Sequence, residues 1–187
     1  DLSLPGIEVN PILSISGEHH FNEVNFTDTF LPESALLGKR GDGRKQVTGE
    51  LSFERSGPDR FLSSFVAVTE MLRAIGTNPS ERQAIALGRL AAHIIVLRRM
   101  SLSIAGMLQN REDPSLQAAM VKDLGSVFEQ ETLEIVRQVL DVEPDAKGPE
   151  QLAIVLDYLI LNAPSFSIRG GTREILRGII ARGLGLR

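Results

Sequence analysis

The sequence contains no cysteine and no tryptophan among its 187 residues, and it has only three histidines and one tyrosine. Without cysteine the chain can form neither disulfides nor thiolate metal sites, which is compatible with the cytoplasm. His19 and His20 would face opposite sides of a strand, and His93 has no acidic partner at helical spacing. We therefore expect a cytoplasmic protein without a metal site, in which the histidines have structural or surface roles.

The sequence also lacks an excess of basic residues and long apolar runs. Its net charge is −4 and its pI is about 5.5, whereas a surface that binds nucleic acid needs clustered Lys and Arg. No apolar run approaches the roughly 18 residues that a membrane span needs, so we expect neither a nucleic-acid partner nor a span. The opening DLSLPGIEV lacks an initiator Met and the layout of a signal peptide. The expectation is a fragment whose N-terminal part is missing.

Residues 1–47 have the pattern of strands and turns. GIEVNPIL alternates between Pro5-Gly6 and Pro11, and FNEVNFTDTFLP carries aromatic and branched residues before it ends at Pro32. The polar, glycine-rich GKRGDGRKQ that follows, residues 38–46, is typical of an exposed connection. Only two or three strands fit here, too few for a sheet with its own core, so this part is predicted to be an incomplete β domain.

From residue 48 onward the hydrophobic period changes to that of helices, and five helices are predicted. Gly76 with Asn78-Pro79 ends the first, Asp113-Pro114 begins the third, and QLAIVLDYLIL is apolar nearly all round and expected to be buried. The apolar stripes are Phe61, Phe65, Val68, Leu72 and Ile75 in the first helix, Leu87, Leu90, Ile94, Leu97, Ile104 and Leu108 in the second, Leu116, Met120, Leu124, Val127, Ile135 and Val139 in the third, and Ile175, Leu176, Ile179 and Ile180 in the last. Short loops favour an antiparallel bundle. The predicted fold is mainly α, a helix bundle preceded by a few strands.

A first candidate site lies in LSFERSGPDRF, residues 51–61. Pro58 is tolerated in the first turn of a helix, so Glu54 and Arg55 are expected at or just before a helix start. A carboxylate there is commonly a cap that complements the helix dipole. The alternative is a carboxylate held over an apolar cavity, where it could act as a base. The serines of LSSF and SLS have no nearby His–Asp arrangement, which argues against a serine nucleophile.

A second candidate site is IRGGTREI, residues 168–175. The two glycines could form a plain turn, with Thr172 as N-cap and Glu174 in the first helical turn. Alternatively, the glycines let a ligand approach the backbone and expose free N–H groups to an oxygen atom. Neither a carboxylate nor a histidine adjoins the glycines, so a base for any chemistry there has to come from elsewhere.

Three collinear segments together resemble the acyl-CoA dehydrogenase family, flavoenzymes that introduce a trans-2,3 double bond into acyl thioesters. LPGIEVNPILSISGEHHFNEVNFTDTFLPESALLG is similar to the end of the family's middle β domain, VTGELSFER to the entry to its C-terminal domain, and GGTREILRGIIARGLGL to its closing signature. The resemblance implies that residues 1–47 are the C-terminal portion of the middle β domain. It implies that residues 48–187 are the C-terminal helical-bundle domain.

The resemblance also implies roles for the two candidate segments. Many members carry the catalytic glutamate where this chain has Gly170, and others carry it on an earlier helix in an L.ER context, which Glu54 matches. Glu54 would remove the α-proton, and the N–H of Gly170 would bind the thioester oxygen together with a flavin ribityl hydroxyl. Hydride would leave the β-carbon for the flavin. Gly171 would contact the substrate and Arg55 the CoA.

The family's cofactor and partners follow in the same way. Thr172, Arg173 and Glu174 match positions that touch the phosphates or ribose of FAD. An acyl-CoA would be the substrate, an electron-transfer flavoprotein the electron acceptor, and the assembly a homo- or hetero-oligomer, dimer or tetramer. Two family elements that contact a neighbouring subunit's flavin, Q..GG.G and R..FG, have no good match, and Arg169 replaces a common tyrosine. These departures suggest a heteromeric assembly or a substrate bulkier than a straight chain.

Two functional hypotheses therefore remain. The first is a flavin-dependent acyl-CoA dehydrogenase with Glu54 as base, of which this chain alone, without the N-terminal domain, would be inactive. The second is a non-catalytic structural subunit of a heteromeric dehydrogenase, motivated by Gly170 and by the missing flavin-contact segments. Acyl-CoA oxidases share the scaffold and are a further alternative.

Overall fold

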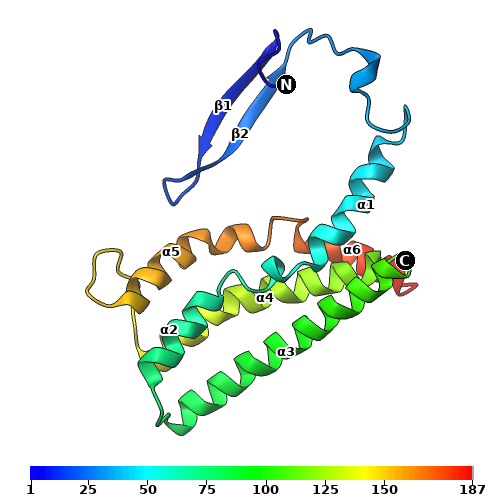
Figure 1. The fold of residues 1–187 in the computed structure, drawn as a ribbon. Helices are drawn as coiled ribbons and strands as arrows, with labels where there is room; N and C mark the ends of the chain where they lie inside the picture. Colours follow the sequence, from blue (N-terminus) through cyan, green and yellow to red (C-terminus); the bar gives the residue numbers. More distant parts are fainter. Residues whose placement is uncertain (187) are drawn as a thin grey trace. The chain divides into compact units, whose positions relative to one another are not determined.

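The computed structural model describes residues 1–186 and divides the chain into two compact units, Asp1–Thr48 and Gly49–Arg187. The described residues form six α-helices, two strands and two short 3-10 helices (Figure 1). The mainly α fold with a helix bundle, predicted from the hydrophobic period, is confirmed.

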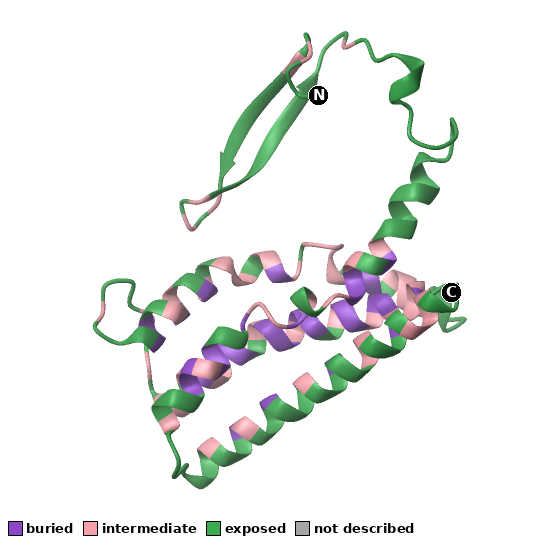
Figure 2. Ribbon diagram, viewed as in Figure 1, coloured by how far each residue is buried: buried purple, intermediate pink, exposed green. Residues whose placement is uncertain are grey.

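The first unit contains an antiparallel hairpin of β1 (Ile7–Leu13) and β2 (His19–Phe26), followed by the 3-10 helix η1 (Glu33–Ala35). The strands pair from Ile7 with Phe26 through Ile12 with Phe21. Pro11, expected at the end of the first strand, lies inside it, which a two-stranded sheet tolerates because both strands are edges. Nearly every strand residue is exposed (Figure 2), since two strands alone cannot enclose a core.

Helix α1 (Gly43–Ser56) corrects two predictions. Residues 43–46, predicted as part of a connection, form its first turn. Glu54 and Arg55, predicted at a helix start, lie instead in its last turn, so Glu54 cannot be an N-terminal cap. The buried residues of α1 are all polar, namely Ser52, Arg55 and Ser56. A helix without an apolar stripe gives no periodic signal, which is why the sequence did not reveal it.

The 3-10 helix η2 (Pro58–Arg60) and helix α2 (Phe65–Ile75) follow. Phe61, predicted as the first residue of a helical stripe, ends η2 instead, because Pro58 starts a separate short turn. Its side chain is nonetheless buried in the core with Val68 and Met71 of α2.

Helix α3 (Glu81–Gln109) runs antiparallel to α4 and packs against it (Figure 1). A capping box of Ser80 and Gln83 fixes its start. By its length and composition alone, α3 could cross a membrane, and it is the one such helix in residues 1–186. It was not predicted from the sequence, where only uninterrupted apolar runs were considered. Only 17% of the most apolar window of α3 is buried, although Leu90, Leu97 and Ile104 belong to the bundle core, and the helix carries the adjacent Arg98 and Arg99. One such helix is weak evidence for a span.

Helix α4 (Ser115–Leu140) is the central helix, which contacts α2, α3, α5 and α6. Its predicted apolar stripe is only partly buried, and Leu124 is 48% exposed. The buried positions are a different set, in which the apolar residues Val121, Phe128, Leu133 and Val136 lie among small and polar ones, namely Ala118, Ala119, Lys122, Gly125, Ser126, Glu129 and Thr132. Small side chains allow four neighbours to approach one helix closely, and this is a tertiary requirement that periodicity does not report.

Helices α5 (Gln151–Phe166) and α6 (Arg173–Gly183) complete the bundle. The prediction that α5 is buried holds for one face only: Leu152, Leu156 and Leu159 are buried, whereas Ile154 and Tyr158 are exposed. In α6 only Leu176 of the predicted stripe is fully buried, and Ile175 is 56% exposed. The turn between α5 and α6 carries Gly170 and Gly171.

Candidate active site

The two candidate segments lie side by side in the second unit. Glu54 of α1 directs its carboxylate at the turn between α5 and α6. A methyl group placed at the Cβ position of Gly170 would lie 3.2 and 3.3 Å from the two carboxylate oxygens of Glu54. The structure therefore brings together the two residues that the sequence assigned to one site, although 115 residues separate them.

Arg60 of η2 holds the Glu54 side chain in this position. Its guanidinium forms an ion pair with Oε1 of Glu54, and its Nε donates a hydrogen bond to the Glu54 carbonyl oxygen at 3.0 Å. The second carboxylate oxygen, Oε2, is buried and has no hydrogen-bond partner within residues 1–186. A buried, unpaired carboxylate oxygen is costly in a folded protein, and such an atom next to a glycine is suited to receive a proton from a bound molecule.

The turn beside this carboxylate requires glycine. Gly170 and Gly171 have φ angles of 69° and 109°, a region that other residues rarely adopt. Arg55 donates from Nε to the Gly170 carbonyl oxygen at 2.7 Å, which fixes the peptide plane. The N–H of Gly170 donates to no acceptor within the part of the chain that the structure describes. The turn thus presents a free amide donor beside a carboxylate.

Arg55 is more buried than a CoA-binding residue needs to be. Only 8% of it is exposed, and burial lowers the pKa of its guanidinium, an effect partly offset by the charge of Glu54. Its terminal nitrogen lies 3.2 Å from the Cβ position of Gly171. Arg55 therefore stabilises the glycine turn through its contacts with Gly170 and Gly171. Its predicted contact with CoA stays a prediction.

A fully buried lysine, Lys122 of α4, lies on the other side of Gly170. Its Cε is 3.4 Å from the Cβ position of Gly170, and its Nζ donates to the carbonyl oxygen of Phe166 at 2.6 Å and to the hydroxyl of Ser126. Burial and the nearby charge of Arg169 lower the pKa of Lys122 to about 8, although Glu129 opposes the shift.

Arg169, predicted to bring charge close to the site, is turned toward α4. Its guanidinium binds Glu129 at 2.8 Å and the hydroxyl of Ser63 at 2.6 Å, and it stacks over the ring of Phe166 at 5.0 Å. Glu129 is fully buried and also accepts the N–H of Ser63. The charge of Arg169 is thus compensated within the bundle.

The predicted cofactor-binding residues lie at the start of α6. Thr172 is the N-cap residue, and Glu174 accepts hydrogen bonds from its own N–H and from Thr172, which lower the pKa of the Glu174 carboxyl. Arg173 donates from Nε to Asp123 of α4 at 2.9 Å. A hydroxyl, a guanidinium and a carboxylate therefore share the first turn of this helix.

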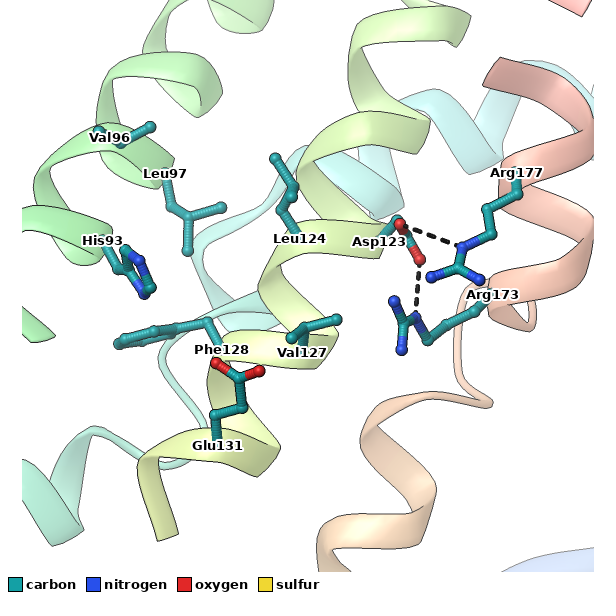
Figure 3. Close-up of a pocket in the computed structure, with 10 residues that line it drawn as sticks. All are labelled: His93, Val96, Leu97, Asp123, Leu124, Val127, Phe128, Glu131, Arg173 and Arg177. Atoms are coloured by element: carbon teal, nitrogen blue, oxygen red, sulfur yellow. Dashed lines mark hydrogen bonds and ion pairs between the residues drawn. The ribbon is translucent and has the colours of Figure 1, made fainter. Parts of the chain in front are cut away.

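Arg173 also borders a pocket of about 470 Å³ between α3, α4 and α6 (Figure 3). Its lining includes the apolar residues Leu97, Val127 and Phe128. The ring of His93 packs edge-on to the ring of Phe128, with 5.7 Å between the ring centroids. Asp123 pairs with Arg173 and more loosely with Arg177 at the edge of the pocket. His93 is therefore a packing residue here. His19 and His20 are exposed and bind Asn22 and Glu18.

Sequence reasoning missed three residues of the Glu54 site. Arg60, Lys122 and Glu129 carry charges that the sequence gave no reason to place there. The available signal was the spacing of Lys122, Ser126 and Glu129, which puts three polar residues on one face of a helix that also carries small residues.

Comparisons with known proteins identify the family of the chain. The family model for the acyl-CoA dehydrogenase C-terminal domain matches residues 59–185. The curated acyl-CoA dehydrogenase FadE34 from Mycobacterium tuberculosis is 29% identical over 185 residues, which cover 98% of this chain and 25% of FadE34. The chain spans about half the length of other curated relatives that it matches.

Solved structures share the fold. Butyryl-CoA dehydrogenase from Megasphaera elsdenii superimposes with a TM-score of 0.83 at 17% identity, covering 99% of this chain and 50% of that one. A chain of the ChsE4–ChsE5 complex from M. tuberculosis gives a TM-score of 0.79 at 21% identity, covering 99% and 51%. Helix bundle, glycine turn and closing signature define the C-terminal helical domain of an acyl-CoA dehydrogenase. The chain belongs to the acyl-CoA dehydrogenase family.

Proposed function

We propose that this chain carries the base and an oxyanion-binding amide of a flavin-dependent acyl-CoA dehydrogenase, with Glu54 removing the α-proton of the thioester. The observation that carries the proposal is the carboxylate of Glu54 beside Gly170, whose N–H is free within residues 1–186. An α-proton next to a thioester is weakly acidic, so its removal needs both a positioned base and a donor for the developing oxyanion.

Each residue around the turn has a part in this scheme. Arg60 orients the Glu54 carboxylate so that Oε2 is available to receive the proton. Arg55 fixes the Gly170 peptide, whose N–H donates to the thioester oxygen as negative charge develops there. A donor aimed at developing charge is worth about 10²- to 10³-fold in kcat. The carboxylate that many relatives carry at position 170 is replaced here by Glu54 from another helix.

The start of α6 fits the flavin dinucleotide that the family uses. Arg173 is a donor of the kind that phosphates accept, and the Thr172 hydroxyl and the Glu174 carboxylate, which are hydrogen-bonded to each other, can both accept from ribose hydroxyls. These three residues would hold FAD. When bound, FAD supplies the acceptor for the hydride that leaves the β-carbon.

The proposed partners are an acyl-CoA as substrate and an electron-transfer flavoprotein as electron acceptor, within a homo- or hetero-oligomer. Support for a heteromer comes from the solved ChsE4–ChsE5 complex, a complex of two named components whose chain shares this fold.

The test is Glu54→Gln in the full-length protein. We expect a loss of about 10²- to 10⁴-fold in kcat, because a general base contributes that much, while the visible spectrum still shows bound flavin. Glu50→Gln is the matched control, since Glu50 is exposed on the same helix and should leave turnover unchanged. Undiminished dehydrogenation by Glu54→Gln would rule out this assignment of the base.

The second candidate function is a non-catalytic subunit of a heteromeric dehydrogenase. It is motivated by SERQAIALGRL, residues 80–90, which stands where the family has R..FG. Arg82 of this segment donates to the Gln138 carbonyl oxygen at 2.7 Å, a contact within the bundle. Under this alternative the purified full-length protein would contain no flavin and show no turnover. One flavin per subunit together with activity would exclude it.

A further inference from the structure

A buried cation that the proposed mechanism does not use lies directly under Gly170. Lys122 has no exposed surface, and its ammonium forms no ion pair with a carboxylate within residues 1–186; it donates to the Phe166 carbonyl oxygen at 2.6 Å and to Ser126. Ser126 in turn donates to the same carbonyl at 3.0 Å. Burying an ammonium without an ion pair is expensive, so the position demands an explanation.

The Lys122 ammonium holds one end of a backbone segment that leads to Gly170. The five residues Phe166–Gly170 join the end of α5 to the glycine turn. Lys122 binds the carbonyl at one end of this segment, and Arg55 binds the carbonyl of Gly170 at the other end at 2.7 Å. The segment is therefore held at both ends by cations that bind backbone oxygens, and its last residue carries the free N–H.

Two of the four cations around the turn are paired with carboxylates and two are not paired within residues 1–186. Arg60 and Arg169 form ion pairs with Glu54 and Glu129, whereas Lys122 and Arg55 have no such partner within residues 1–186. The aliphatic end of Lys122 comes within 3.4 Å of the Cβ position of Gly170. The ammonium is bonded to this carbon, so its charge lies near the turn, and in a buried environment a nearby positive charge stabilises a negative charge more strongly than it would in water.

We propose that Lys122 is a positioning residue for the reaction, which holds Phe166–Gly170 in place and adds positive potential where the thioester oxyanion develops. This inference rests on the proposed function. Glu54 of α1, Arg60 of η2, Glu129 of α4 and Arg169 of the α5–α6 turn are the charged groups that act on it. The charged form of Lys122 supports catalysis, and its neutral form does not.

The pH dependence has a distinctive sign. Since the pKa of Lys122 is about 8 in the folded chain and 10.5 when unperturbed, activity should fall as the pH rises through about 8. Stability should change in the opposite direction. Between pH 8 and 10.5 the unfolded state binds more protons, so this residue's contribution to stability increases with pH there. A purely structural lysine would not make activity fall while stability rises.

The experiment uses full-length protein with butyryl-CoA, octanoyl-CoA, palmitoyl-CoA and cholyl-CoA as substrates. We expect Lys122→Met to lower kcat about tenfold with little change in KM and to remove both pH effects. Lys122→Arg should retain kcat within about threefold and also lose both pH effects, because a guanidinium stays charged throughout this range. Lys147→Met, at an exposed lysine, is the matched control and should behave as wild type.

The outcomes are separable. An unchanged kcat and pH profile in Lys122→Met would overturn the inference, as would a decline through pH 8 that persists in Lys122→Arg. If neither variant folds, a wild-type kcat that stays flat through pH 8 overturns it, and opposite trends of activity and stability support it. Absence of wild-type turnover on every substrate would instead count against the proposed function. Loss of turnover in Glu54→Gln, together with wild-type kcat and pH profile in the Lys122 variants, would count against this inference alone.

Discussion

At the scale of single residues, the site depends on a backbone conformation as much as on side chains. Gly170 has a φ of 69°, which an L side chain adopts only with strain of about 1 kcal/mol. It also has neighbours on two sides, the Glu54 carboxylate and the end of Lys122. A glycine here therefore does two things: it permits the turn, and it leaves room for a carboxylate that comes from another helix.

Gly170→Ala should destabilise the protein by about 1 kcal/mol from backbone strain and displace the Glu54 carboxylate, since the added methyl would lie 3.2 Å from Oε2. Turnover should fall while bound flavin is retained. Chemical denaturation and steady-state kinetics measure the two effects. Gly88→Ala is the control: Gly88 is in α3 with no atom near its Cβ position, and alanine there should stabilise by about 0.5–1 kcal/mol. An equally active Gly170→Ala would contradict the geometry.

At the scale of elements, α4 positions the site because η2 packs directly onto it. A Cβ on Gly125 of α4 would overlap the Arg60 carbonyl oxygen and lie 3.1 Å from the Cβ of Phe61. The same 3-10 helix carries Arg60, which holds Glu54. Close packing of a short helix on a glycine thus sets the direction of the proposed base.

Gly125→Ala should therefore push η2 away from α4, at a cost of about 1–3 kcal/mol in unfolding free energy. Because Arg60 moves with η2, kcat should drop as well. The comparison is Gly106→Ala in α3, where no atom lies near the Cβ position and no loss of stability is expected. Chemical denaturation measures the difference, and we expect a lower midpoint for Gly125→Ala than for Gly106→Ala. Equal midpoints would show that η2 and α4 are packed less tightly than described.

At the scale of the whole bundle, one buried charge joins three segments far apart in sequence. Glu129 of α4 accepts the N–H of Ser63, next to α2, and pairs with Arg169 of the turn between α5 and α6. Glu129 is fully buried, whereas the side chain of Arg169 is 30% exposed. Breaking a buried pair from one side leaves an uncompensated charge, which is more costly than removing both partners.

Arg169→Met should consequently cost about 3 kcal/mol, and the double variant Arg169→Met/Glu129→Leu should recover part of that loss. It should not recover all of it, because the Ser63 N–H then lacks an acceptor. Unfolding of the two single variants and the double variant completes the cycle. Arg177→Met should cost under about 1 kcal/mol, because the Arg177 side chain is largely exposed and lies 3.7 Å from Asp123, which keeps its closer partner Arg173. Strictly additive changes would mean that Glu129 and Arg169 are not coupled.

Much of the fold could be predicted from the sequence because the hydrophobic period and the boundary residues mark most of the helices, even where burial differs from the predicted stripe. Helix α3 has a capping box at its start and buries Leu90, Leu97 and Ile104 of its predicted stripe. Helix α1 could not be found in the same way, since its buried residues are polar. The buried face of α4 was predicted incorrectly because a helix with four neighbours buries small and charged residues, such as Gly125, Lys122 and Glu129, among its apolar ones.

The sequence by itself determined the mainly α fold, the glycine turn before the last helix, and the resemblance that linked Glu54 to Gly170. Local backbone preferences and motifs can be read residue by residue, so these features needed no coordinates. Only the tertiary structure decided that Glu54 faces Gly170, that Arg60 holds it there, and that Lys122 is buried beneath the turn. These are contacts between segments distant in the chain, and packing in three dimensions, which sequence spacing does not encode, brings them together.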